Sequence, residues 1–470
     1  MRKMRKVAAL ALSAAMIVGM LAGCGSSDQG STSGSTSSAG GTSSGKTGSV
    51  YYLNFKPEIA DVYEKVAADY KAETGVEVKV VTAASGEYES TLKSEIAKSD
   101  APTLFQINGP VGYQNWKDYC ADLKDTDLYS KLSDQSMAVT GDDGGVYGIP
   151  YAVEGYGIIY NNEIMDKYFA LDSKKASASS MEDIKDFASL KEVVEDMQAN
   201  ADALGIKGVF ASTSFAAGED WRWQTHLLNV PLEEEFAENS DYSSPILAGL
   251  ASKEIEFKYA DTFKNIFDLY INNSCTKSTL LSGKTVDQSM AEFALGQCAM
   301  VQNGNWAWGQ ISAVDGNVVK EDQIKMLPIY TGSANDSSKG LCVGTENYFA
   351  INKNASAEDQ QASIDFITWM FTSDTGKAYV SGDLGFIAPF NTFSDDEKPA
   401  DPLAKEVMSW MSKDGVTSVP WAFASFPSEN FKKAVGSALL EYVNGQGEWD
   451  KVVSTTKEQW ASEYASANAQ

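Results

Sequence analysis

Two segments of the chain combine tryptophan with polar side chains, and the first of them covers residues 219–223. Trp221 and Trp223 flank Arg222 directly after Glu219 and Asp220. Sugars present flat apolar faces surrounded by hydroxyl groups, so a sugar site needs aromatic rings for stacking and polar groups for hydrogen bonds around the ring. The pattern predicts that Glu219 and Trp221 contact a saccharide. Trp223 is a further candidate, although one of two tryptophans spaced in this way often faces the core.

The second segment, residues 303–308, reads Asn-Gly-Asn-Trp-Ala-Trp. Trp306 follows a polar turn, where a position in the core is less natural than a position in a binding site. We therefore expect Asn303 and Trp306 to bind the same saccharide, with Trp308 as a further candidate. Tryptophans on predicted helices, such as Trp369 and Trp460, are expected in the core.

Motifs of the common enzyme classes are absent from the sequence. There is no GxSxG, HExxH, P-loop or GxGxxG pattern. The single histidine, His226, falls in a predicted helix over residues 223–228, where a surface or core role is expected rather than catalysis. The cysteines have no CxxC spacing. We expect a protein that is not an enzyme and has neither a cofactor nor a metal site, although the 64 acidic residues leave a carboxylate pair of the glycosidase type open.

Strand and helix patterns alternate after residue 48. Strands are predicted at 50–55, 76–81 and 103–107, and helices at 57–74 and 87–98. This order is typical of a parallel sheet flanked by helices, in which ligands bind at the loops after the carboxyl ends of the strands. The loops at 54–56, 84–86 and 106–109 therefore supply further site candidates, namely Asn54, Lys56, Gln106 and Asn108.

About 420 residues follow residue 47, which is more than one hydrophobic core usually supports, so two lobes are expected. A second series of strands and helices begins near residue 156. Helices are predicted after Ser356 and after Ser428, which are both suited to be N-caps. The second of these helices should bury Phe431, Val435 and Leu439 on one face.

The first 47 residues are of two kinds. Four basic residues precede an apolar run that is too short for a comfortable membrane span, and the small residues Ala22 and Gly23 then precede Cys24. This end of the run resembles the bacterial lipobox, which implies that residues 1–23 are a signal peptide and that Cys24 carries diacylglycerol. Residues 24–47 are rich in Gly, Ser and Thr and are expected to be a flexible tether. The predicted location is the extracellular face of the cell membrane.

The chain has a formal net charge of −26, and removal of a leader with four basic and no acidic residues makes the mature chain more negative. Such a surface repels nucleic acid and anionic lipid headgroups. We expect no nucleic-acid partner, and contact with the membrane only through the lipid anchor.

Three segments resemble bacterial extracellular solute-binding proteins of the maltose-binding type. They are residues 148–163, with Gly-Ile-Pro-Tyr-Ala-Val-Glu and Ile-Tyr-Asn-Asn-Glu, residues 299–308, and residues 349–353, with Phe-Ala-Ile-Asn-Lys. Their order and spacing match over nearly the whole mature chain. The resemblance implies an α/β, two-lobed periplasmic-binding-protein-like fold of type II. Each lobe would have a mostly parallel sheet flanked by helices, and hinge strands would cross between the lobes. It further implies a monomer that closes on a carbohydrate and delivers it to the permease of an ABC importer.

The resemblance also implies roles for single residues. Glu154 lies where the family uses a carboxylate on sugar hydroxyls, and Trp306 lies where an aromatic ring stacks on a sugar. Glu219 and Trp221 match a carboxylate and aromatic pair, and Trp421 lies near a late aromatic subsite. A hinge salt bridge is the alternative role for Glu154, and a buried helix anchor is the alternative for Trp421. The loop at 106–109 departs from the maltose binders, which carry an aromatic and charged residues there.

The predicted lobes are residues 48–154 with 331–372, and residues 155–330 with 373–470. The predicted function is capture of an oligosaccharide for import. A cell-surface polysaccharide hydrolase or lyase and a surface lectin remain alternatives, since both would also be secreted and rich in tryptophan. A polyamine as the solute would suit the negative charge and would require several carboxylates facing the cleft.

Overall fold

The computed structural model describes residues 48–467. The predicted leader, Cys24 and the tether lie outside the described residues. Within residues 48–467, none of the helices has the length and apolar character that a membrane span needs. The four cysteines of this part of the chain, Cys120, Cys275, Cys298 and Cys342, are free thiols.

The first sheet has the strand order β2-β1-β3-β10-β5-β4. Its strands are β1 (Val50–Asn54), β2 (Val78–Thr82), β3 (Leu104–Asn108), β4 (Val139–Thr140), β5 (Val146–Pro150) and β10 (Asn347–Ile351). β1 is parallel to β2 and β3, as predicted, whereas β10 is antiparallel to β3 and β5. β4 is antiparallel to β5. The sheet is therefore parallel at its N-terminal strands and contains two reversed strands, the edge strand β4 and β10, which enters from the other lobe.

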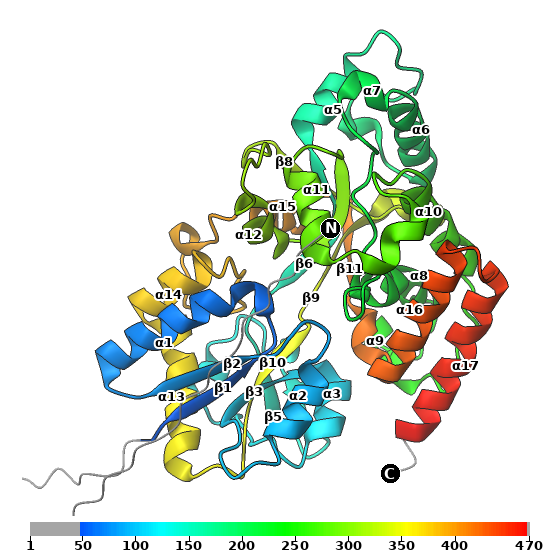
Figure 1. Ribbon diagram of the computed structural model, residues 1–470. Helices are drawn as coiled ribbons and strands as arrows, with labels where there is room; N and C mark the ends of the chain where they lie inside the picture. Colours follow the sequence, from blue (N-terminus) through cyan, green and yellow to red (C-terminus); the bar gives the residue numbers. More distant parts are fainter. Residues whose placement is uncertain (1–47, 468–470) are drawn as a thin grey trace, which may run out of the picture. The chain divides into compact units, whose positions relative to one another are not determined.

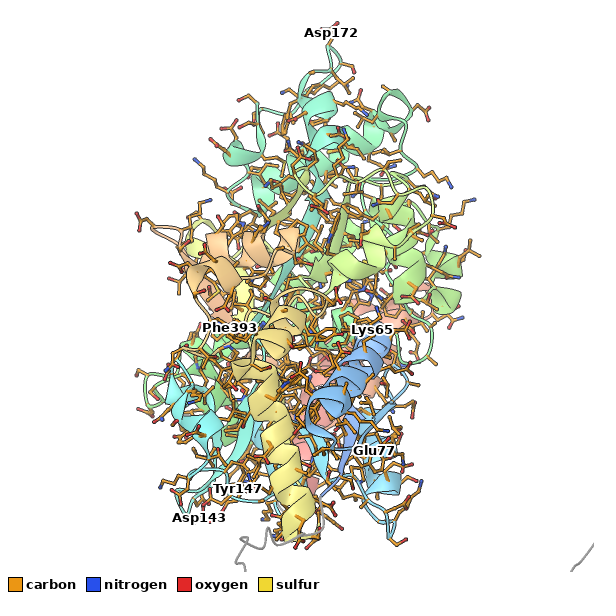
Figure 2. The ribbon with its side chains drawn as sticks, turned by 90° about the vertical axis from the view of Figure 1, so that its left-hand side faces the viewer. Lys65, Glu77, Asp143, Tyr147, Asp172 and Phe393 are labelled. Atoms are coloured by element: carbon orange, nitrogen blue, oxygen red, sulfur yellow. The ribbon has the colours of Figure 1, made fainter. Side chains whose placement is uncertain are left out.

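Helices cover both faces of this sheet. α1 (Ala60–Thr74) and α13 (Ala357–Thr372) lie side by side over one face (Figures 1 and 2), where the ring of Tyr70 meets Phe366 at 5.0 Å. α2 (Tyr88–Glu95) and α3 (Gly109–Trp116) pack on the other face against residues such as Leu53 and Phe105. Alternate residues of β1 point to opposite faces, because Tyr52 belongs to one core and Leu53 to the other.

The second sheet has the order β11-β9-β6-β7, and β8 also pairs with β6. Its strands are β6 (Glu154–Asn161), β7 (Met300–Gly304), β8 (Ile324–Leu327), β9 (Lys339–Gly344) and β11 (Thr417–Pro420). β6 is antiparallel to β7, β8 and β9, while β9 is parallel to β11. Every strand except β6 therefore runs in one direction, so the predicted mostly parallel sheet is interrupted by the strand that enters from the first lobe.

The remaining helices belong mainly to the second lobe. They are α5 (Asn162–Phe169), α6 (Phe187–Ala199), α7 (Ala201–Leu204), α8 (Leu228–Ala237), α9 (Pro245–Ala251), α10 (Ala260–Asn272), α11 (Val286–Ala294), α12 (Ala307–Ser312), α15 (Pro402–Met411), α16 (Glu429–Val443) and α17 (Trp449–Ala467), with the short α4 (Asp127–Ser130) and α14 (Asp374–Ser381) in the first lobe. Ser428 caps α16 by accepting a hydrogen bond from the Phe431 N–H at 3.1 Å. Phe431, Val435 and Leu439 are buried, as the spacing predicts.

The two lobes exchange strands through short connections. Residues 151–153 join β5 to β6, and residues 345–346 join β9 to β10, so that β9 leads directly from the second sheet to the first (Figure 1). A third crossing leads from α14 to α15. The lobe boundaries differ from the predicted ones at two places. β9 pairs in the second sheet, and Val380 of α14 lies in the first core, because backbone pairing and burial rather than sequence order assign each segment to a lobe.

Candidate functional site

A cavity of about 770 Å³ lies between the two lobes, within the range of small-molecule sites. The first lobe contributes the loops after its strands, at residues 55–58, 84–89 and 108. Glu154, the first residue of β6, and Glu346, on the connection between β9 and β10, also line the cavity. The second lobe contributes residues 215–221, 224–226, 286–287, 306, 310, 429, 432–433, 436–437 and 440. The three loops predicted from the strand pattern thus lie at the cavity, which is built from both lobes.

Aromatic rings form one wall of the cavity. The centroids of Trp221 and Trp306 lie 6.2 Å apart at an interplanar angle of 54°. His226 lies beside both rings and stacks on Tyr156 at 4.4 Å and 11°. A Cβ on Gly304 would lie 2.2 Å from the ring of Trp306, so only glycine lets the indole lie against the backbone there. The predicted turn starts later than the sequence indicates, because Asn303 and Gly304 end strand β7, and Gly304 has a steric role in placing Trp306.

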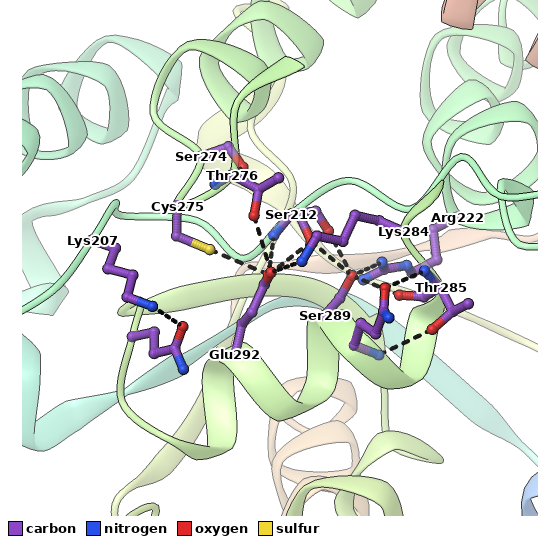
Figure 3. A network of polar contacts seen from close by, with 12 residues as sticks. Lys207, Ser212, Arg222, Ser274, Cys275, Thr276, Lys284, Thr285, Ser289 and Glu292 are labelled. Atoms are coloured by element: carbon purple, nitrogen blue, oxygen red, sulfur yellow. Dashed lines mark hydrogen bonds and ion pairs between the residues drawn. The ribbon is translucent and has the colours of Figure 1, made fainter. Parts of the chain in front are cut away.

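A buried arginine holds the segment that carries Trp221. Arg222 begins a π-helical turn, Arg222–Leu227, and π-helical turns often occur at functional sites. Its guanidinium donates to the Gln302 carbonyl and to the hydroxyls of Ser214 and Ser289, each at 3.0 Å. Figure 3 shows Arg222 beside Ser289 and the continuation of these contacts through Ser212 to Glu292. Burial lowers the pKa of Arg222 to about 9.

A buried ion cluster connects the first lobe to the hinge. Lys56 Nζ lies 2.8 Å from Glu154 and 3.6 Å from Glu58, and 5.6 Å from the centroid of Trp306. Burial alone would lower the pKa of Lys56, but the charges of Glu154 and Glu58 and the hydrogen bond to Glu154 raise it above the ordinary value. The salt bridge considered as an alternative role for Glu154 therefore exists, and Glu154 also lines the cavity.

His226 and Glu346 have strongly shifted pKa values. Burial, followed by the charges of Lys432, Lys56 and Arg222, lowers the pKa of His226 well below its ordinary value, so its imidazole is neutral. Burial raises the pKa of Glu346 to about 7, although Lys432 and Lys56 act against this shift. The wall of the cavity therefore holds a neutral imidazole and a carboxyl that titrates near neutral pH.

Six of the twelve predicted ligand-binding residues line the cavity. They are Lys56, Asn108, Glu154, Glu219, Trp221 and Trp306. One carboxylate oxygen of Glu219 already has a partner, because its Oε2 accepts a hydrogen bond from the Val286 N–H at 2.9 Å, at the start of α11.

Two of the other six residues shape the first-lobe loop from behind. Asn54 donates to the Lys56 carbonyl at 2.8 Å and accepts from the Lys56 N–H at 3.1 Å. Gln106 accepts from the Phe55 N–H at 2.6 Å. Both side chains are buried, and they fix the backbone that carries Lys56.

The remaining four predicted residues lie in or against the second-lobe core. Trp223 donates to the Ser214 carbonyl at 3.0 Å, and Asn303 donates to the sulfur of Met290. Trp308, on α12, is partly buried and packs against a hydrophobic cluster that includes Met290, Phe293 and Ile311. Trp421 is 2% exposed behind the aromatic wall, where it meets Trp306 edge to face, which agrees with its alternative role as a buried anchor.

Sequence reasoning missed three kinds of lining residue. His226 was expected to be a surface or core residue, and it is 4% exposed yet reaches the cavity. Glu346 has no motif of its own, and only the crossing of β9 into β10 brings it to the site. One face of α16 also lines the cavity, with Glu429, Lys432 and Gly436. Their helical spacing in the sequence shows that they share a face, but it does not show which part of the protein this face contacts.

The chain resembles several solved structures of binding proteins. It is 18% identical to a chitin oligosaccharide binding protein, with a TM-score of 0.66 and coverage of 90% of this chain and 100% of that chain. It is 18% identical to RafE in complex with raffinose, with a TM-score of 0.64 and coverage of 89% and 100%. It is 15% identical to maltose-bound T. maritima MalE3, with a TM-score of 0.63 and coverage of 88% and 98%. These similarities show a shared two-lobed fold.

A comparison with curated proteins found no match. Residues 65–425 match the family described as bacterial extracellular solute-binding protein, which covers most of the two lobes and both hinge connections. The sheet order, the crossing strands and the cavity between the lobes agree with this match, and the chain belongs to the bacterial extracellular solute-binding protein family.

Proposed function

We propose that this protein binds an oligosaccharide between its lobes and delivers it to an ABC importer. The observation that carries the proposal is the cavity, in which Trp221 and Trp306 of the second lobe face polar loops of the first lobe. Indole rings stack on the apolar faces of sugars, and the surrounding carboxylates and amides accept or donate hydrogen bonds to hydroxyl groups.

The cavity suits a ligand that contacts both lobes at once. Trp221 and Trp306 belong to the second lobe, Lys56 and Asn108 to the first, and Glu154 to the hinge. A ligand that touches both lobes binds the closed state more tightly than the open state, and only this difference in affinity drives closure. The cavity volume of about 770 Å³ favours an oligosaccharide over a monosaccharide.

The similar structures support the same class of ligand. Those proteins are named for, or were solved with, chitin oligosaccharide, raffinose and maltose. The absence of the enzyme motifs sought in the sequence favours binding without catalysis. The protein would act as a monomer at the outer face of the membrane, anchored by a lipid on Cys24 through the tether of residues 24–47.

A thermal-shift screen of neutral oligosaccharides tests the proposal, because a ligand that binds only the folded protein raises the melting temperature by mass action. Calorimetry on the sugars that register should give one site per chain. A screen in which no sugar raises the melting temperature contradicts the proposal.

Three further measurements separate the alternatives. Release of reducing ends from starch, xylan or mannan would indicate a hydrolase or lyase. Small-angle scattering should show compaction when the ligand is added, whereas binding without compaction would indicate a lectin. Detergent phase partitioning tests the anchor, since the variant Cys24→Ala should move from the detergent phase to the aqueous phase.

A further inference from the structure

The cavity is rich in acidic groups. Nine carboxylates and three lysines are among its lining residues, which leaves an excess of six acidic side chains. A site for a neutral sugar needs hydrogen-bonding groups but no such excess of one sign. In a cavity with low-dielectric walls, charges of one sign focus the field and attract counterions. The lining therefore favours a ligand with positive charge.

Two of the three lysines are already paired with cavity carboxylates. Lys56 lies between Glu154 and Glu58, and Lys432 lies 2.7 Å from Glu429. Glu346 differs from these carboxylates, because it has neither a hydrogen bond nor an ion pair with any of residues 48–467. It lies on the connection between β9 and β10, where this connection lines the cavity between the lobes.

Several of these carboxyls are held in an environment that disfavours their negative charge. Burial raises the pKa values of Glu58, Glu89 and Asp220, and it raises that of Glu346 to about 7. A cationic group placed among them would remove this penalty, because an opposite charge at short range favours the ionised carboxylate.

A second observation points to a ligand independently of the acidic groups. His226 is 4% exposed, lines the cavity, and has no hydrogen-bond partner for its ring nitrogens among residues 48–467. A neutral imidazole offers one donor and one acceptor, and both are free to bond a polar group that enters the cavity. The rings of Trp221 and Trp306 both lie next to His226, at centroid distances of 5.2 Å and 5.4 Å, so a ligand group that bonds the imidazole would lie beside two indoles.

We propose that the ligand is an oligosaccharide with free amino groups, of the glucosamine type, and that Glu346 binds one of its ammonium groups. This inference rests on the proposed function and adds the charge of the ligand. The aromatic wall and His226 favour an amino sugar over a linear polyamine, because a polyamine has neither flat faces for stacking nor hydroxyl groups for the imidazole. The faces of Trp221 and Trp306 also attract ammonium groups.

A matched series of three β-1,4-linked tetramers tests the proposal. Cellotetraose, tetra-N-acetylchitotetraose and the glucosamine tetramer differ at carbon 2, where they carry a hydroxyl, an acetamide and an ammonium group. Calorimetry on the full chain at pH 7 should show that the glucosamine tetramer binds at least tenfold more tightly than cellotetraose. Salt should reduce this advantage, because it screens the long-range attraction between the acidic lining and a cationic tetramer. Glu346→Gln should reduce it to less than threefold, whereas the control Glu254→Gln, at an exposed position away from the cavity, should leave it unchanged.

The other outcomes are distinguishable. Equal binding of all three tetramers, or a preference for the uncharged ones, overturns the amino-sugar proposal and leaves the proposed function intact. Binding of spermidine in the absence of binding by any tetramer overturns both. An advantage of the glucosamine tetramer that persists in Glu346→Gln overturns the role of Glu346.

Discussion

Gly86 of the first lobe and Gly218 of the second lobe touch at the edge of the cavity. A Cβ on Gly86 would lie 2.9 Å from the Cα of Gly218, and both residues have positive φ angles, of 71° and 78°. Beside them, Ser85 Oγ donates to the Gly218 carbonyl at 3.4 Å. The two loops can approach this closely because neither glycine has a side chain. This contact therefore joins a first-lobe loop to a second-lobe loop.

The substitution Gly86→Ala should weaken ligand binding by about tenfold, or about 1.4 kcal/mol. The added methyl group would collide with Gly218 only when the lobes are closed, so the open form is favoured. Gly75→Ala is the matched control, because Gly75 has a φ of 78° and a Cβ added there would meet nothing within 4 Å. Both variants should lose about 1 kcal/mol of stability from backbone strain. Equal ligand affinities of the two variants by calorimetry would contradict the role of the Gly86 contact.

Trp306→Ala should weaken oligosaccharide binding by about 1 to 3 kcal/mol, because it removes an aromatic face from the cavity. Trp308→Ala serves as the control, since Trp308 packs against the hydrophobic cluster around Phe293 and does not line the cavity. It should lower the melting temperature with little change in affinity. Calorimetry that finds unchanged affinity for Trp306→Ala would remove Trp306 from the site.

Lys56→Met should lower the free energy of unfolding by about 3 to 5 kcal/mol, because it leaves the carboxylates of Glu154 and Glu58 buried without a cation. Adding Glu154→Gln to this variant removes one of the two unpaired charges, so the double variant should be more stable than Lys56→Met alone. Urea denaturation of Lys56→Met, Glu154→Gln and the double variant measures how far the free energies of unfolding depart from additivity. Strictly additive losses would show that the two side chains do not interact.

Glu346 should make the unliganded protein less stable as the pH rises from 5 to 8. Its pKa is about 7 in the folded protein and near 4.5 in the unfolded chain. Between these values the unfolded chain has released the proton that the folded protein retains, so increasing pH favours unfolding. The Glu346→Gln variant has no titrating group at this position. At pH 8 its free energy of unfolding should therefore be about 2 kcal/mol higher than that of the parent. The two proteins should be similar at pH 5.

Urea denaturation at both pH values, with Glu254→Gln as a control for the loss of one charge, checks this prediction. Glu154, Glu429, Lys56 and Lys432 also act on Glu346 and stay the same in both proteins. A stability difference that does not change between pH 5 and pH 8 would show that Glu346 has an ordinary pKa.

The sequence by itself determined the local elements and the loops of the site. Helix α16 begins after Ser428 and buries the predicted face, because capping and helical periodicity depend only on neighbouring residues. The strands at the start of the chain predicted the loops that carry Lys56 and Asn108, and the Asn-Gly-Asn turn predicted that Trp306 lies in the cavity wall.

Only the tertiary structure decided which side chains share the cavity. Trp221 faces the cavity and Trp223 the core, because the π-helical turn and the contacts of Arg222 set their directions. Glu346 and His226 reach the site from distant parts of the chain through the crossing of β9 into β10 and the packing of the aromatic wall. Their places at the cavity depend on contacts between residues far apart in the chain, and such contacts leave no periodic or spacing signal in the sequence.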